Sequence, residues 1–416
     1  MTAQAARTTA QALDYRRPRV AFISTRALDG EAMAGRLHVS RAIRSALEGW
    51  SDLSLHRLPS VLTDPSLFRI FDATSAAVGS VFRWPILPLQ CAIFAGSRDL
   101  ERLIDALPPD LDAVYLDGVR SYAFLAALRR RRPDLRIVID LDDLMSRRMS
   151  LLLEADQHLS PGYLTKRLPG LLRRLITSKP VGKLIVMFER ATLRQIERSI
   201  CNLGDAVVLL SAVDAAALER FTFTRGRRAD IVLIPPPRQL VPTRKPFVEP
   251  ARFVFVGSDA LTQNRLTIDY LLNFWRRHRI ETPLVLYGLK YRQLSLPPSV
   301  VAAGYVDGIE DVYDGRSILI TPSLIGGGIK TKVLEAFAYG APVIGNALTF
   351  ESISLGDYPL CISDETELLS LVRNPRLHQA TFRRAVAHGV DYVARAHDVD
   401  TFTTRWRKLM VPEEAR

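Results

Sequence analysis

A stretch late in the chain combines the residue types that bind phosphate. Glycines 326–328 follow a short apolar run, and Lys330 and Lys332 come next, at the start of a helix predicted over 331–339. Glycines let a ligand approach the backbone, and the free amides at a helix N-terminus attract anions. Lysines in the first turn oppose the helix dipole, a cost that a bound anion would offset. The pattern predicts a diphosphate cradle; the alternative is a tight turn with solvated lysines.

Glu335 stands about one turn beyond the two lysines. Its carboxylate can accept hydrogen bonds from a ribose whose diphosphate occupies the glycine loop. A diphosphate that leaves during a reaction gains negative charge, which Lys330, Lys332 and the helix N-terminus can stabilise without a metal ion. Lys330 is therefore predicted to be catalytic as well as substrate-binding.

Aspartates follow a predicted strand at 136–140 in the first half of the chain. Asp140, Asp142 and Asp143 can act in three ways. Carboxylates hold Mg²⁺ or Mn²⁺ against a diphosphate, orient or deprotonate a hydroxyl group, or cap a following helix. We predict no metal site, because the aspartates lie far in sequence from the glycine–lysine stretch. Asp142 is instead predicted to be catalytic on the acceptor side.

Further residues of the first half are candidates for contact with an acceptor. Gly35, Arg36 and His38 follow the first predicted strand, without the Gly-x-Gly-x-x-Gly fingerprint of dinucleotide-binding proteins. His38 is predicted to be catalytic, although a lone histidine is more often structural. Arg147 and Arg148 come just after the aspartates, where they either grip an acceptor diphosphate or are solvated.

The elements that must position these residues alternate between strands and helices. The strands are continuous apolar runs, typical of parallel sheets buried on both faces. In the first half we predict strands at 19–24, 113–117, 136–140 and 206–211, and helices at 34–47 and 122–131. In the second half we predict strands at 253–257, 284–287, 318–322 and 342–344, and helices at 265–277 and 331–339. This alternation favours an α/β fold with doubly wound sheets.

A segment with six prolines, 234–250, separates the two halves and is predicted to be a linker. We predict, in chain order, a disordered arm (1–18), an acceptor-side Rossmann-like domain (19–233), the linker, a donor-binding Rossmann-like domain (251–395) and a C-terminal helix (396–416) that can pack back on the first domain. Ligands of parallel sheets bind beyond the carboxyl ends of the strands. A cleft between two such domains would hold two substrates.

The segment 326–344, GGGIKTKVLEAFAYGAPVI, resembles the donor-site signature of the group 1 (family four) retaining nucleotide-sugar glycosyltransferases. Phe255-Val-Gly-Ser258 with Asn264 is similar to the start of their donor domain, and residues 303–307 resemble a loop on the nucleobase side. Asp117-Gly118 and residues 140–143 weakly resemble strand ends of bacterial polysaccharide transferases. The resemblance implies the GT-B fold of two Rossmann-like domains facing a cleft, a nucleotide diphosphate sugar as donor, and retention of anomeric configuration.

The predicted donor-binding residues are Gly257, Ser258, Asn264, Gly326, Gly327, Gly328, Lys330, Lys332 and Glu335. By the resemblance, Glu335 is the second carboxylate of the family's Glu-x7-Glu pair and holds the ribose. The first carboxylate, which touches the donor sugar, would fall at 327, where this chain has Gly327. Sugar recognition is therefore left without an assigned residue. No cofactor is implied, because the nucleotide sugar is a co-substrate.

Composition excludes several other classes of protein. The 416 residues are 48% hydrophobic and 24% charged, enough to bury a large core. Three widely spaced cysteines argue against disulfides and a structural zinc site, and no metalloprotease or serine-nucleophile motif occurs. We find neither an apolar stretch long enough to span a membrane nor a secretory signal, so the predicted location is cytoplasmic.

The net charge of +12 is concentrated in the first half, where residues 1–238 hold 35 basic and 25 acidic residues. Arginine bias, a nucleic acid, or an anionic membrane or substrate would each explain it. Residues 163–183 carry six basic and no acidic side chains among apolar ones. They predict a helix that lies on an anionic membrane or one that packs on its own domain. No basic stripe interleaved with aromatics indicates nucleic-acid binding.

These observations predict a hexosyltransferase-type glycosyltransferase, peripheral on the inner face of the cell membrane. Its acceptor would be a lipid-linked saccharide in exopolysaccharide or lipopolysaccharide biosynthesis. Three alternatives remain: a catalytically silent homologue that binds a nucleotide or a partner, a nucleotide-sugar epimerase, and a nucleic-acid-binding protein.

Overall fold

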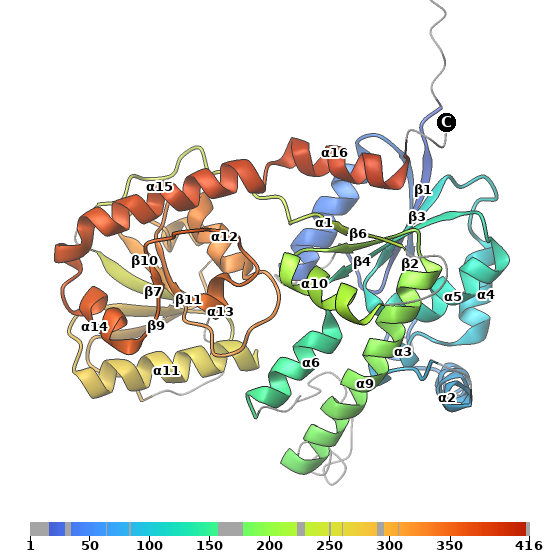
Figure 1. Ribbon diagram of the computed structural model, residues 1–416, viewed down its shortest axis with the longest axis horizontal. Coiled ribbons are helices and arrows are strands. Elements are labelled where there is room, and N and C mark those ends of the chain that lie inside the picture. Colours follow the sequence, from blue (N-terminus) through green and yellow to red (C-terminus); the bar gives the residue numbers. More distant parts are fainter. Residues whose placement is uncertain are drawn as a thin grey trace, which may run out of the picture.

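The computed structural model describes residues 16–29, 35–63, 65–82, 85–156, 178–222, 229–248, 251–259, 261–288, 295–306 and 308–412. These residues form two α/β domains side by side, each built on a parallel sheet of six strands (Figure 1). Parallel strands need crossover connections, and the connecting helices cover the sheet faces. The predicted fold class, two Rossmann-like doubly wound domains, is confirmed.

The first sheet has the strand order β2–β1–β3–β4–β5–β6. Its strands are β1 (Arg19–Ser24), β2 (Asp52–Arg57), β3 (Ala113–Asp117), β4 (Arg136–Asp142), β5 (Ala206–Leu209) and β6 (Asp230–Leu233). The side chains of β3 and β5 are buried throughout, as their continuous apolar sequences predict. The edge strand β2 has only exposed and half-buried side chains, and its mixed polar sequence gave no strand prediction.

The first domain divides its apolar side chains between two cores, one on each face of the sheet. In β1, Ala21 and Ile23 join one core, and Val20 and Phe22 join the other. The helices are α1 (Gly35–Glu48), α2 (Leu67–Val81), α3 (Leu89–Ala92), α4 (Ser97–Asp105), α5 (Tyr122–Arg131), α6 (Met145–Glu154), α9 (Lys179–Leu203) and α10 (Ala212–Phe221).

The second sheet has the strand order β12–β11–β10–β7–β8–β9. Its strands are β7 (Arg252–Val256), β8 (Leu284–Tyr287), β9 (Val300–Gly304), β10 (Ser317–Ile320), β11 (Val343–Asn346) and β12 (Cys361–Ile362). The helices are α11 (Thr262–His278), α12 (Thr331–Ala338), α13 (Ala347–Phe350), α14 (Glu365–Arg373), α15 (Gln379–Ala396) and α16 (Val399–Met410). The strands and helices predicted for this half all occur, with ends shifted by a few residues.

The chain crosses between the domains twice. Residues 234–248 have neither helix nor strand, and α15 and α16 run from the second domain back over the first (Figure 1). Trp406 of α16 is buried in the first domain, 5.4 Å between ring centres from Tyr115. The two crossings are joined, since Arg238 N donates to His397 O at 2.8 Å.

Two predicted segments fall largely outside the described residues. They are most of the N-terminal arm, 1–15, and residues 163–177 of the basic amphipathic segment. Lys179 and Lys183 from the end of that segment lie in the first turns of α9 and pair with Asp156. Across the described ranges, no helix is long and apolar enough to cross a membrane.

Candidate donor and acceptor sites

The predicted glycine–lysine cradle is a loop between β10 and α12. Gly327 and Gly328 have φ angles of 97° and 68°, in the left-handed region that favours glycine. Asn346 holds the preceding segment: its side chain accepts from Ser323 N at 3.1 Å and donates to Ser323 O at 2.8 Å. The loop therefore has a defined shape beyond the carboxyl end of β10, the edge where parallel sheets bind ligands.

The N-terminus of α12 faces this loop without a cap. Lys330 is the N-cap residue, and no side chain within the described residues caps the helix at this position. The first amides of a helix have no partner within the helix. Lys330 Nζ donates to Gly327 O at 2.6 Å, and burial lowers the pKa of this lysine. Free amides and an ammonium group thus lie together, as the cradle requires.

Lys332 is half-buried beside the residues that follow β7. Its Nζ donates to Asn264 Oδ1 at 2.9 Å and lies 4.3 Å from the centre of the Phe255 ring. A Cβ at Gly257 would lie 2.8 Å from this ammonium group and 2.7 Å from Asn264 Nδ2, so a side chain there would force both to move. Burial, and secondarily the charge of Lys330, lowers the pKa of Lys332 to about 7.

Predicted residues from three segments therefore meet at this edge of the second sheet. Asn264 connects two of them, because its Nδ2 donates to Ser258 O at 2.8 Å while its Oδ1 accepts from Lys332. Ser258 contributes its carbonyl oxygen to this arrangement. Asp307, the last residue of the predicted nucleobase-side loop, lies outside the described residues.

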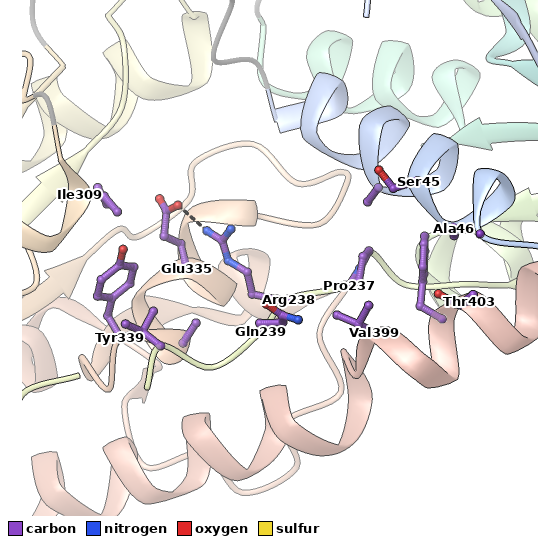
Figure 2. Close-up of a pocket in the computed structure, with 15 residues that line it drawn as sticks. Ser45, Ala46, Pro237, Arg238, Gln239, Ile309, Glu335, Tyr339, Val399 and Thr403 are labelled. Carbon is purple, nitrogen blue, oxygen red and sulfur yellow. Dashed lines mark hydrogen bonds and ion pairs between the residues drawn. The ribbon is translucent and has the colours of Figure 1, made fainter. Parts of the chain in front are cut away.

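Glu335 lies at one end of a cavity of about 660 Å³ between the domains (Figure 2). Its carboxylate pairs with Arg238 of the interdomain segment, and Tyr339 follows one turn later on the same side. Ser45 and other residues of α1 form the opposite wall. The volume is in the range of small-molecule sites.

The acceptor-side candidates converge at the carboxyl ends of β3 and β4. The guanidinium group of Arg36 pairs with Asp117 at 2.6 Å, Asp140 at 2.8 Å and Asp142 at 3.2 Å. Asp117 and Asp140 are fully buried, and the Tyr115 hydroxyl donates to Asp140 at 2.9 Å. Arg36 thus fills the space between three carboxylates. Among the described residues, no group of three metal-ligating side chains is placed to hold a metal ion.

Asp142 differs from its neighbours in conformation and acidity. Its φ of 66° is unusual for a residue other than glycine, and the pairing of β4 with β5 shifts register here. Burial, opposed by Arg36, raises the pKa of Asp142 to about 6. Its side chain is 25% exposed, whereas that of Asp140 is 0% exposed. Asp142 is thus the most exposed of the three carboxylates around Arg36.

His38 lies on α1, apart from the carboxylate cluster, and its side chain is exposed. It precedes Ala42 by one helical turn, and Ala42 lines the cavity of Figure 2. Residues four apart share a helix face, which turns His38 toward the interdomain side. The catalytic role of His38 stays a prediction.

Glu351, which sequence reasoning missed, joins the glycine loop to the first domain. It follows α13, accepts a hydrogen bond from Gly327 N, and pairs with Arg147 of α6 at 2.7 Å. Arg147 is 18% exposed and also contacts Asp214 at 3.3 Å. The alternative that Arg147 is a solvated arginine is therefore wrong. Glu351 stands 24 residues after Gly327, and no spacing in the sequence links the two.

Asp143 makes a second contact between the domains. It pairs with Arg148 and lies beside Gly328, where a Cβ would be 2.6 Å from the carboxylate oxygens. The glycine loop therefore has a carboxylate at each end, Glu351 near Gly326 and Asp143 near Gly328. The glycines make room for these acidic side chains.

Comparison with known proteins identifies a matching family and a shared fold. Residues 250–373 match the family Glycosyl transferases group 1. None of the curated proteins compared with the chain matches it in sequence. Over 94% of this chain, the fold is similar to three solved structures, each covered to 98%. They are sucrose-phosphate synthase from Thermosynechococcus elongatus (TM-score 0.61, 14% identity), Anabaena HepE in complex with UDP-glucose (0.58, 11%) and the lipopolysaccharide outer core galactosyltransferase WaaB (0.58, 12%).

At these identities the structural likeness concerns the fold, and the family match covers the second domain. The predicted resemblance to group 1 is confirmed for the second domain, because the family match includes the glycine–lysine loop. The predicted two-domain fold is confirmed by the similar solved structures. Residues 250–373 therefore match the group 1 glycosyl transferases, and the chain as a whole shares the two-domain fold of the GT-B structures.

Proposed function

We propose that this protein transfers a hexose from a nucleotide diphosphate sugar to an acceptor hydroxyl group between its two domains. The observation that carries the proposal is the half-buried Lys332, which has no carboxylate partner among the described residues, next to the uncapped N-terminus of α12. Within the described residues no carboxylate pairs with Lys332, so an external anion would supply the missing partner. HepE is solved with UDP and with UDP-glucose, which makes a uridine nucleotide the first donor to test.

In the proposed reaction, Glu335 holds the ribose, and Lys330, Lys332 and the amides of α12 hold the diphosphate. The bond between the anomeric carbon and the β-phosphate oxygen breaks, and its electron pair stays on the diphosphate. The lysines stabilise this charge as it develops. The acceptor oxygen bonds to the anomeric carbon, and its proton passes to the carboxylate of Asp142.

The proposal is tested by thermal stabilisation with UDP, GDP, ADP and their sugar conjugates. We expect one preferred nucleotide, and loss of its effect in Lys330→Ala and Glu335→Ala. Lys408→Ala and Glu365→Ala are matched controls, because both residues are exposed and lie away from the cavity. No stabilisation by any nucleotide, or equal stabilisation of every variant, would contradict the donor site.

Turnover assays then separate the remaining alternatives. Release of nucleotide that requires an added acceptor supports the transferase. Conversion of the donor to its epimer without acceptor identifies an epimerase. Nucleotide binding with neither reaction identifies a catalytically silent homologue.

A lipid-linked acceptor at an anionic membrane is part of the proposal. It is supported by the basic first half of the chain and by an apolar face of α2. Leu67, Phe71 and Phe82 are 87%, 72% and 86% exposed, and their spacing places them on one helix face. Arg98 lies 4.4 Å from the Phe68 ring and adds positive charge beside this face. Apolar and basic side chains together fit an anionic bilayer surface.

Flotation with vesicles tests the membrane part alone. We expect binding to phosphatidylglycerol vesicles at low salt, weaker binding to phosphatidylcholine vesicles, and loss of binding in the double variant Phe71→Ser, Phe82→Ser. Leu377→Ser is the control, because Leu377 is 80% exposed on the second domain. A wild-type protein that stays unbound, or a double variant that still floats, would rule out α2 as the docking surface.

A further inference from the structure

We infer that Glu351 is the carboxylate that recognises the transferred sugar. It would take the role of the family's first carboxylate, which would fall at position 327, where this chain has glycine. This inference rests on the proposed function, and it assigns the substrate contact that the sequence left open. It starts from two contacts: Glu351 accepts a hydrogen bond from Gly327 N, and its Oε1 lies 2.7 Å from where a Cβ of Gly326 would be.

The order of groups along the loop places the sugar. Glu335 marks the ribose end, and Lys332 and Lys330 with the free amides of α12 mark the diphosphate. Gly327, whose amide donates to Glu351, comes next in this order, three residues before Lys330. The group attached to the far phosphate, which is the sugar, therefore lies nearest Glu351.

The charge of Glu351 suits this position. Its side chain is 13% exposed, its Oε2 pairs with Arg147 at 2.7 Å, and its charge opposes the fall in the pKa of Lys330. A carboxylate held by an arginine can accept further hydrogen bonds from hydroxyl groups. Arg147 belongs to the first domain, so it positions Glu351 on the side from which the acceptor arrives. Arg147 is a positioning residue in this arrangement.

The glycines at 326 and 327 follow from the same arrangement. A side chain at Gly326 would displace the Glu351 carboxylate. A side chain at Gly327 would adopt a strained φ of 97° and lie 3.3 Å from Leu151 Cδ1. A glutamate at 327 is thus disfavoured in this loop, and a carboxylate from another segment occupies the neighbouring space.

Glu351→Gln is the variant that tests the inference. Glutamine keeps an oxygen that accepts from Gly327 N and loses the charge. We expect affinity for UDP within about twofold of wild type, and kcat/KM for the preferred nucleotide sugar lower by roughly 10- to 100-fold, as for loss of a charged hydrogen bond. Discrimination between UDP-glucose and UDP-galactose should fall by a similar factor. Glu365→Gln, which alters a paired glutamate elsewhere in the same domain, should change neither quantity.

The outcomes separate this inference from the proposed function. Unchanged sugar discrimination in Glu351→Gln, or a loss of UDP affinity as large as the loss of kcat/KM, would overturn the role of Glu351 and leave the donor site intact. Failure of the wild type to bind any nucleotide would overturn both. Arg147→Gln should raise the KM for the nucleotide sugar with a smaller change in kcat, whereas a merely structural contact would lower thermal stability without altering sugar preference.

Discussion

The two domains place charged side chains at the same edge of similar sheets but balance the charges differently. In the first domain, Arg36 is enclosed by three carboxylates, and Arg26 lies 3.3 Å from one of them, Asp117. In the second domain, Lys330 and Lys332 lie together, and burial lowers the pKa of both. The cation of the first site pairs with three carboxylates, whereas Lys332 of the second has no carboxylate partner within the described residues.

The difference in charge pairing distinguishes residues that stabilise the fold from residues that we propose bind a ligand. When a charged side chain is removed from water and well paired, loss of its partner strongly destabilises the fold. When such a side chain has no counter-ion, the charge itself destabilises the fold. Arg36 is of the first kind and Lys332 of the second. Asp142 is intermediate, because it pairs with Arg36 at 3.2 Å and yet is 25% exposed. The comparison therefore ranks the effects of substitution at each site.

The largest effect on stability is expected from Arg36→Met. Its removal leaves Asp117 and Asp140 buried without their main partner, and we expect unfolding to become easier by about 3–5 kcal/mol, or failure to fold. Lys332→Met should alter stability by less than about 1 kcal/mol, since it removes a half-buried charge that has no carboxylate partner among the described residues. It should also abolish nucleotide binding. Urea unfolding of both variants checks the contrast. Equal destabilisation would show that the two sites do not differ as described.

Asp142→Asn should lower kcat by at least about a hundredfold, the usual contribution of a positioned base, with UDP affinity unchanged. Burial raises the pKa of Asp142 to about 6, so the carboxyl group is protonated below that pH and the rate should fall as the pH drops through it. The variant should lack this acid limb. Asp29→Asn is the control, because the Asp29 side chain is 89% exposed. An acid limb that persists in Asp142→Asn assigns the proton transfer to another group.

Binding of a nucleotide sugar should weaken as the pH rises above about 7, the pKa of Lys332. Only the protonated lysine attracts the diphosphate, so the dissociation constant should grow about tenfold for each pH unit above that value. A nucleotide sugar is the suitable probe because its diphosphate does not titrate in this range. Titration calorimetry in buffers of different ionisation enthalpy should show proton uptake on binding above this pKa. A flat pH dependence in the wild type would mean that Lys332 does not contact the diphosphate.

Much of the fold was predictable because its strands are short apolar runs between helices. Residues 19–24, 113–117 and 284–287 were predicted with the bounds that the structure has. β2 was missed, since an edge strand with half-buried side chains lacks the continuous apolar pattern of a central strand. Local sequence also placed the glycine–lysine loop before a helix, because its glycines, its lysines and the start of α12 are neighbours in the chain.

The contacts that complete the sites were not predictable in the same way. Glu351 reaches Gly327 across 24 residues, and Arg238 reaches Glu335 across 97. Arg36 was considered only as a contact for an acceptor, because nothing in the sequence indicates that the ends of β3 and β4 surround it. Each of these contacts depends on the order of strands in a sheet or on the contact between the two domains. The spacing of residues in the chain predicts neither the strand order nor the domain contact.

Arg238→Gln tests whether Glu335 must release its own counter-ion, Arg238, when a nucleotide binds. Arg238 and Glu335 form a pair whose side chains are 34% and 27% exposed, and such pairs are worth up to about 1 kcal/mol. If the ribose must displace Arg238, the variant should bind UDP a few-fold more tightly, by no more than about fivefold. Glu335→Gln should bind UDP more weakly, and titration calorimetry measures both. A loss of more than about tenfold in Arg238→Gln would show instead that the guanidinium group contacts the nucleotide. The interdomain segment would then belong to the donor site, and closing the domains would be part of binding.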